Sequence, residues 1–244
     1  MRTLILASSA LILASSAVLA QAPGTQPGAP GVGGPPPGVV PPPGQETKKN
    51  ANPCRDEVAA ALTKLRKSSW FRMNTTMITE SGPSAMVVDY VLPDKMYQKV
   101  TQTLTKQSSE VILIAAKAWG NQGAGWQELP GDVMNALRTQ MYDNVIQEQT
   151  EVGEYACKGR VQIDGRDALS YKLEEERDKN STAVKNEAFR MFYVDAVTGL
   201  PLSNALLVPG RENSPLFKAT YSFPLDMKIE PPKDVVKAGD DGKK

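Results

Sequence analysis

Apolar and polar residues alternate along residues 85–119, and this alternation predicts short β-strands that follow one another in an antiparallel meander. Turn residues interrupt the alternation at Pro93-Asp94 and at residues 106–109, so three strands are expected. One face of the first two strands is mostly apolar, whereas lysines and threonines occupy the other. The predicted face consists of Met86, Val88 and Tyr90, followed by Met96, Gln98, Val100, Gln102 and Leu104.

The same period of two continues on both sides of this meander. It predicts a first strand over residues 70–80, with Phe71, Met73, Thr75 and Met77 on one side. Asp164-Gly165 predicts a hairpin between residues 161 and 173, because this pair readily adopts the positive φ angles of a type I′ turn. Glycines in residues 120–125 predict a turn before Trp126. Later strands are expected over 189–194, 202–208 and 216–223.

Two stretches have a helical period. Residues 53–68 follow Asn52, which can cap the helix, and Pro53 suits the first helical position. Their apolar stripe consists of Val58, Ala61, Leu62 and Leu65. Residues 132–148 are expected to form the second helix, with Asp132 as N-cap. Its apolar positions recur at four-residue spacing, as Val133, Leu137, Met141 and Val145.

The two ends of the chain differ in composition from its middle. Residues 1–20 combine Arg2, an apolar run and a small-residue end, which is typical of a cleaved signal peptide. Residues 21–50 contain nine prolines and seven glycines and are expected to be a disordered linker. This linker is either a plain solvated leader or a spacer that contacts envelope or cell-wall components. Residues 51–232 are the predicted folded domain, and 233–244 a disordered tail.

Composition argues against several classes of function. The chain has 28 basic and 27 acidic residues among 244, which gives no strong charge to attract nucleic acid. It contains no histidine, so the commonest general base and the commonest transition-metal ligand are absent. The acidic residues of 174–178 are best interpreted as a solvated loop. We therefore expect a protein without catalytic residues, metal or cofactor.

Cys54 and Cys157 are the only cysteines. A secreted chain with an even number of cysteines usually pairs them, so a disulfide between the two is predicted. The alternative is a reactive thiol, but no histidine or neighbouring cysteine is present to lower the pKa of either thiol. Methionine is concentrated in the predicted strands and in the second helix, and its flexible side chain suits a surface that adapts to acyl chains.

The order of these elements resembles a known family. A helix, a meander broken at Leu-Pro-Asp-Lys, the run V-I-L-I-A-A-K-A-W and a second tryptophan at Trp126 resemble the periplasmic lipoprotein-carrier superfamily, LolA-like or LppX-like, over residues 54–225. The turn D-x-x-T-G-L-P at residues 195–201 is also similar to that superfamily. Carriers of this kind usually insert more than one helix midway along the chain, whereas only residues 132–148 are predicted here.

The resemblance implies an α+β fold, in which a strongly curved antiparallel half-barrel carries an N-terminal helix and an inserted lid helix over a hydrophobic cavity. It implies a periplasmic protein that binds lipid or a lipidated protein. The alternative is a non-catalytic envelope scaffold with a closed core, whose proline-rich tether does the binding. The residues expected to line the cavity are Met73, Met77, Met86, Val88, Tyr90, Met96, Val100, Met134, Leu137 and Met141.

Overall fold

The computed structural model describes residues 51–80, 82–148, 152–174 and 188–236. The chain divides into two units, Met1–Lys48 and Lys49–Lys244, and the second contains every described residue. The predicted signal peptide and linker, the acidic residues 175–178 and the end of the predicted tail lie outside the described residues.

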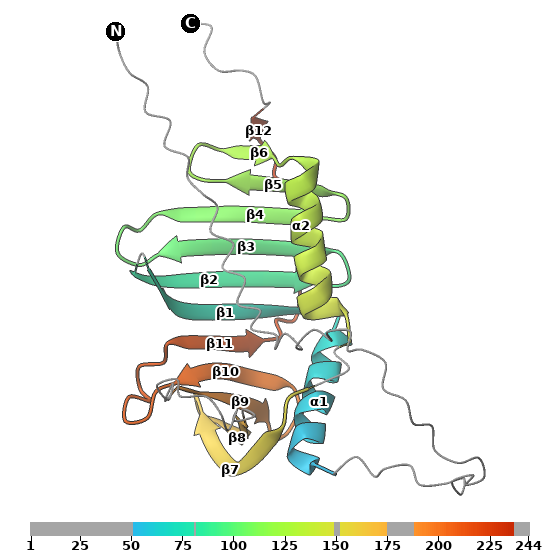
Figure 1. Cartoon of the computed structure of the whole chain (residues 1–244). Coiled ribbons are helices and arrows are strands. Elements are labelled where there is room, and N and C mark those ends of the chain that lie inside the picture. Colours follow the sequence, from blue (N-terminus) through green and yellow to red (C-terminus); the bar gives the residue numbers. More distant parts are fainter. Residues whose placement is uncertain (1–50, 81, 149–151, 175–187, 237–244) are drawn as a thin grey trace, which may run out of the picture. The chain divides into compact units, whose positions relative to one another are not determined.

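Twelve strands form one sheet in the order β12-β6-β5-β4-β3-β2-β1-β11-β10-β9-β8-β7 (Figure 1). Strands β1 to β6 form one meander and β7 to β11 a second, and the pairing of β1 with β11 joins the two. All pairs are antiparallel except β12 with β6. The strands of the first meander are β1 (Trp70–Thr79), β2 (Gly82–Val91), β3 (Lys95–Gln102), β4 (Ser108–Ile114), β5 (Lys117–Asn121) and β6 (Trp126–Glu128). Those that follow are β7 (Tyr155–Ile163), β8 (Arg166–Leu173), β9 (Phe189–Asp195), β10 (Pro201–Leu207), β11 (Phe217–Ser222) and β12 (Val235–Val236).

The predicted meander is present, but residues 85–119 contribute to four strands instead of three. The run 111–119 folds back on itself, because Ala115 adopts a φ of 52° and starts a tight turn between β4 and β5. An alanine rarely adopts this conformation, so no residue type in this run predicts the turn. The prediction that Leu104 belongs to the apolar face of the second strand is wrong: Leu104 lies in the turn after β3, with 71% of its surface exposed. Gly120 belongs to β5, and the predicted turn begins only after Asn121.

The hairpin predicted around Asp164-Gly165 is confirmed. Asp164 has a φ of 51° and Gly165 a φ of 76°, and they connect β7 to β8. The prediction that residues 233–244 form a disordered tail is wrong at the start of this segment, because Val235 and Val236 pair with Trp126 and Gln127 of β6.

Helix α1 spans Pro53–Arg66 and is capped as predicted, since the Asn52 side chain accepts a hydrogen bond from the Arg55 amide at 3.1 Å. Helix α2 spans Gly131–Met141 and continues as a π-helical turn, Tyr142–Ile146. Asp132 is not its N-cap: Pro130 occupies that position, and no side chain caps the helix. Asp132 lies in the first turn instead, where its charge still favours the helix dipole.

Both helices lie on the same face of the sheet, which is called the helix face below. Directly paired residues of antiparallel strands point to the same side, so the side chains can be followed from strand to strand. Thr75 pairs with Ala219, Ala219 with Asn204, Asn204 with Phe192, and Phe192 with Tyr171. Tyr171 and Phe192 contact α1, whereas Met73 and Phe71, on the same side of β1 as Thr75, contact α2.

The connection through α2 explains why a helix crosses this face. Strand β6 lies near one edge of the sheet and β7 is the other edge, so the chain between Glu128 and Tyr155 must traverse the strands. Figure 1 shows α2 lying across β1 to β5 near one end of these strands. The predicted α+β class is confirmed, as a curved antiparallel sheet that does not close, with two helices.

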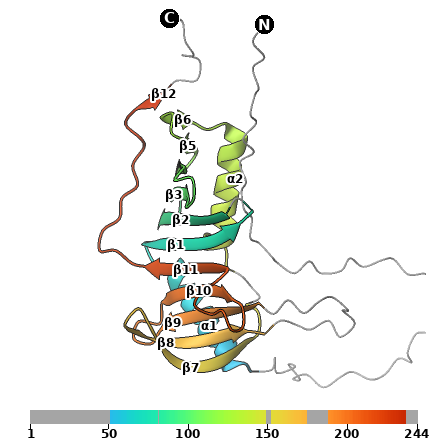
Figure 2. The ribbon, with the colours of Figure 1, turned by 90° about the vertical axis from the view of Figure 1, so that its left-hand side faces the viewer.

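The opposite face is mainly polar but has an apolar cluster of its own. Arg72 forms a two-bond ion pair with Asp89, at 2.6 and 2.8 Å, and Lys99 lies 2.8 Å from Glu110. The segment after β11 covers part of this face, because Ile229 packs against Ile112 of β4. Figure 2 shows that this segment and α2 lie on opposite sides of the sheet.

Candidate functional site

The largest apolar cluster lies between α2 and the helix face. It is called the α2 cluster, and its buried members are Leu65, Phe71, Val88, Tyr90, Met96, Leu113, Ala118, Leu137 and Met141. Phe71, Tyr90, Met96, Leu113 and Ala118 form one continuous row across β1 to β5, because each is paired with the next. Helix α2 lies over this row with Leu137 and Met141 pointing to the sheet.

Eight of the ten residues expected to bind ligand meet in the α2 cluster or pack against it. They are Met73, Met86, Val88, Tyr90, Met96, Met134, Leu137 and Met141. The other two, Met77 and Val100, lie on the helix face nearer the opposite ends of their strands and do not join the cluster. The alternation of apolar and polar residues therefore predicts the helix face correctly, but it does not predict at which position along each strand α2 lies.

Sequence reasoning missed several members of the α2 cluster. Leu113 and Ala118 were missed because the turn at Ala115 was not foreseen. Tyr221 and Phe223 pack against the cluster from the end of the second meander. Their contribution depends on the pairing of β1 with β11, for which the sequence carries no local signal.

The two helices are attached to the sheet in different ways. Helix α1 is linked by the disulfide between Cys54 and Cys157, whose Cα atoms are 5.3 Å apart, so the predicted disulfide is confirmed. Its N-cap residue Asn52 also donates to Glu154 at 2.6 Å. Nearer its end, Lys64 donates to the carbonyl of Thr198 at 2.9 Å.

Helix α2 has no such links. Among the described residues, no hydrogen bond, ion pair or disulfide connects a side chain of residues 131–146 with the sheet, and the only side-chain bond in this segment joins Arg138 to Asn135 at 3.1 Å. The contact between α2 and the sheet consists of apolar side chains. Five of them are methionines, three from the strands and two from α2: Met73, Met86, Met96, Met134 and Met141. Helix α2 is thus held by packing alone.

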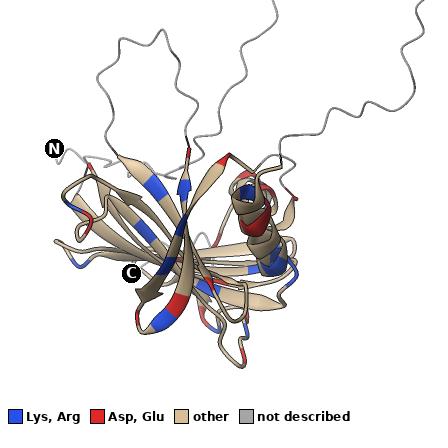
Figure 3. Cartoon of the chain, turned by 90° about the horizontal axis from the view of Figure 1, so that it is seen from below, with Lys and Arg blue, Asp and Glu red and all other residues tan. Residues whose placement is uncertain are grey.

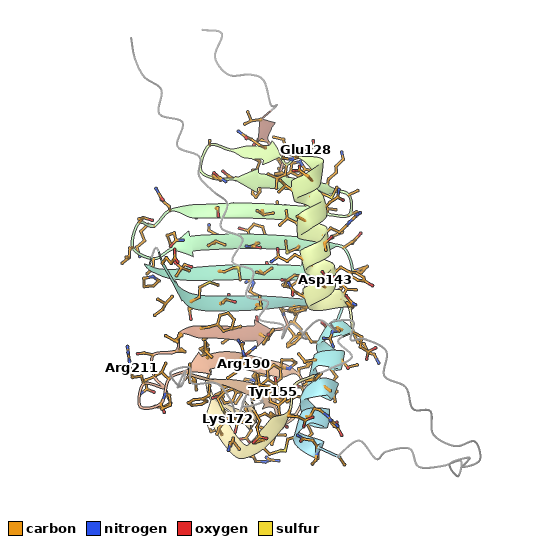
Figure 4. All side chains as sticks on the ribbon, viewed as in Figure 1. Glu128, Asp143, Tyr155, Lys172, Arg190 and Arg211 are labelled. Carbon is orange, nitrogen blue, oxygen red and sulfur yellow. A yellow bond between two sulfur atoms is a disulfide. The ribbon has the colours of Figure 1, made fainter. Side chains whose placement is uncertain are left out.

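A few polar groups interrupt the helix face. In the described part of the chain, the Oγ1 atom of Thr75 is buried without a hydrogen-bond partner, and so is the Oε1 atom of Gln102. Burial raises the pKa of the Tyr90 hydroxyl well above its usual value. Arg190 also lies on this face, where its Nη1 donates to the Asn204 side chain at 3.2 Å. Figure 4 shows Arg190 and Tyr155 in the second meander, away from α2.

The described residues contain no group of three histidine, cysteine, aspartate or glutamate side chains that could hold a metal ion. Neither of their helices is long and apolar enough to cross a membrane. In Figure 3, basic residues (blue) and acidic residues (red) are both present on the strands and on the helix seen in this view.

No protein-family model and no curated protein matches the sequence. Among solved structures, the chain is similar to the lipoprotein LppX of Mycobacterium tuberculosis, with a TM-score of 0.47, 13% identity, and coverage of 70% of this chain and 95% of LppX. It is also similar to LprF from Mycobacterium bovis, with a TM-score of 0.47, 11% identity, and coverage of 75% and 98%. The chain is also similar to MucB, with a TM-score of 0.40 and 13% identity. This similarity covers 70% of this chain but only 58% of MucB.

Proposed function

We propose that the protein binds lipid or a lipidated protein in the periplasm, and that it holds acyl chains against the helix face beneath α2. The observation that carries this proposal is the unequal attachment of the two helices. Helix α1 has a disulfide and polar bonds to the sheet, whereas α2 has only apolar contacts with the described residues of the sheet. An acyl chain can replace apolar contacts without leaving a polar group unsatisfied, so α2 can act as a lid.

The composition of the α2 cluster supports the same function. Methionine is unbranched and polarizable, and it fits surfaces of varying shape better than branched aliphatic residues do. Five methionines meet between α2 and the sheet, three from strands and two from the helix. An interface of this kind can repack around chains of different length.

The disulfide supports the periplasm as the compartment, because such bonds form and persist in oxidising environments. The predicted signal peptide, residues 1–20, would direct the chain there. The proline-rich residues 21–50 would then separate the domain from an envelope or cell-wall partner.

One observation favours the alternative of an envelope scaffold with a closed core. Leu137 and Met141 of α2 are only 4% and 3% exposed, so the α2 cluster is closely packed in this structure. A closed lid and a permanent core look alike when no ligand is bound. They differ in how they respond to a charge at the interface.

Substitution Met141→Lys tests the two functions. If α2 is a lid, it moves away from the sheet and lets the new ammonium group reach water, so the affinity for a fluorescent fatty acid falls while the melting temperature changes by only a few degrees. If the cluster is a permanent core, an unpaired charge is buried, and the free energy of unfolding falls by about 3 kcal/mol or more. Gln140→Lys, on the exposed side of α2, is the matched control and should change neither quantity.

Native mass spectrometry of protein extracted from its own envelope provides an independent measurement. The proposal expects co-purified lipid or a lipidated peptide that is lost from the Met141→Lys variant. Protein free of lipid, together with a collapse in the melting temperature of Met141→Lys, would contradict the carrier and favour the scaffold.

A further inference from the structure

Arg190 is a charged residue in an apolar setting. It lies on β9, two residues before Phe192, and therefore points to the helix face with it. Its paired neighbour on β10 is Leu206, which is paired in turn with Phe217 on β11. The side chains beside Arg190 along this row are thus apolar.

The contacts of the Arg190 guanidinium group do not neutralise its charge. The group donates to the neutral amide of Asn204 at 3.2 Å and lies 5.9 Å from the centre of the Phe217 ring. Within the described part of the chain, no carboxylate lies within ion-pair distance of it, whereas Arg55, Arg72 and Arg166 each have a carboxylate partner. A half-buried guanidinium without an anion is costly, because a neutral hydrogen bond and a ring contact replace only part of its lost hydration.

Two phenols lie within reach of this charge. Burial raises the pKa of Tyr155, and it raises the pKa of Tyr221 to about 12, but the positive charge of Arg190 opposes both shifts. Tyr155 is on β7 and Tyr221 on β11, four strand spacings apart, which is about 19 Å on a flat sheet. Arg190, on β9, lies midway between them, two strand spacings or about 10 Å from each strand, so its long side chain lies between the two phenols. The order of the strands therefore places Arg190 among polar groups of three other strands.

A second observation extends this polar region toward α2. Asn204, which binds Arg190, is paired with Ala219, and Ala219 is paired with Thr75. Thr75 is only 1% exposed, and its hydroxyl oxygen has no hydrogen-bond partner among the residues that the structure describes. Met73 and Met86, which pack against the α2 cluster, are its neighbours along and across the strands. An unsatisfied hydroxyl is thus placed between Arg190 and the proposed chain-binding surface.

We propose that Arg190, together with Asn204 and Tyr155, binds the anionic headgroup of an amphiphile, a carboxylate or phosphate, while the acyl chain extends along the helix face past Thr75 to the α2 cluster. This inference rests on the proposed function and makes it more specific, since it selects anionic over neutral lipids. The planar guanidinium fork suits two oxygens of a carboxylate or phosphate. The aromatic ring of Phe217 and the amide of Asn204 hold the fork in place before the ligand arrives.

The test compares oleate with oleyl alcohol, which has the same chain and no charge, in titrations with the full mature protein. The variants are Arg190→Gln, which removes the charge, and Arg190→Lys, which keeps the charge but not the fork. Arg211→Gln is the matched control, because Arg211 is exposed in the loop between β10 and β11 (Figure 4). Inorganic phosphate is titrated separately, to distinguish a lipid headgroup from a free anion.

The proposal expects Arg190→Gln to weaken oleate binding about 10- to 100-fold, the usual effect of losing a charged hydrogen-bonded contact. Arg190→Lys should fall between wild type and Arg190→Gln, and the affinity for oleyl alcohol should stay the same in every variant. Since no carboxylate among the described residues pairs with Arg190 and would be left unpaired, the melting temperature of Arg190→Gln without ligand should be unchanged or slightly higher.

Four results would overturn the headgroup site. In two of them, Arg190→Gln loses affinity for oleate and oleyl alcohol equally, or loses affinity for neither. In the other two, the melting temperature of Arg190→Gln without ligand falls strongly, or the wild-type protein binds inorganic phosphate tightly and Arg190→Gln abolishes this binding. In the first three cases wild-type protein still binds both chains, so the proposed function survives. If wild-type protein binds neither oleate nor oleyl alcohol, the proposed function fails together with the headgroup site.

Discussion

Cys54, in the first turn of α1, is bonded to Cys157 on the edge strand β7, 103 residues later in the chain. Around this bond, Asn52 caps the helix and donates to Glu154, and Arg55 lies 3.1 Å from the same carboxylate. These hydrogen bonds lower the pKa of Glu154, with the one from Asn52 contributing most. The start of the domain is thus attached to an edge strand that has only one neighbour in the sheet.

Loss of this disulfide should destabilise the domain. Closing a loop of about 100 residues contributes up to about 4.7 kcal/mol on the chain-entropy model, so Cys54→Ser with Cys157→Ser should lower the free energy of unfolding by roughly 2 to 5 kcal/mol. Urea denaturation measures this difference. Wild-type protein made in an oxidising compartment should show no free thiol after denaturation, and two titratable thiols per chain would contradict the bond.

The turn between β9 and β10 predicts a dependence of stability on pH. Asp195 is buried and accepts hydrogen bonds from the amide of Thr198 at 2.7 Å and from that of Val197 at 3.0 Å, and it is paired with Arg166. Burial alone would raise the pKa of Asp195, but these hydrogen bonds hold it below the usual value. Its stabilising contribution is therefore complete above the unfolded pKa of about 3.9, and it is lost as the pH falls through the lower folded pKa.

Asp195→Asn should lower the free energy of unfolding by about 1 to 3 kcal/mol at pH 7, because the charge-assisted bonds are lost. It should also make stability less dependent on pH below about 4. Urea denaturation at pH 7 and at acid pH measures both effects. Asp143→Asn, at an exposed position of the π-helical turn, is the control (Figure 4). Equal acid sensitivity of wild type and Asp195→Asn would show that other groups control the pH dependence.

Ala115→Gly should stabilise the protein. Ala115 is exposed and has a φ of 52°, a left-handed conformation that costs an alanine roughly 1 to 2 kcal/mol. Glycine avoids this cost but adds about 0.4 to 1 kcal/mol of entropy to the unfolded chain, so the net gain should be about 0.5 to 1 kcal/mol. Thermal unfolding measures the gain. Ala116→Gly, at the next position, which is also exposed and has no positive φ, should be destabilising. A loss of stability in Ala115→Gly would contradict the turn geometry.

Much of the local structure was determined by the sequence alone. The period of two assigned Met73, Val88 and Met96 to one face, and Asp164-Gly165 identified a hairpin. Asn52 and Pro53 marked the start of α1. These features could be predicted because each depends on the conformational preferences of a few consecutive residues.

Only the tertiary structure decided which parts of these surfaces meet. The pairing of Met73 with Tyr221 joins the two meanders through strands β1 and β11, which lie more than a hundred residues apart in the sequence, and nothing local to either strand encodes it. The order of the strands places Arg190 of β9 two strands from Tyr155 of β7 and two strands from Tyr221 of β11, and its charge opposes the rise in the pKa of both phenols. Met77 was assigned to the correct face but remains outside the α2 cluster, because the position of α2 depends on a connection that crosses the sheet. Such relationships arise from contacts between distant segments, whose free energy depends on the whole fold and cannot be read from the period of any single strand.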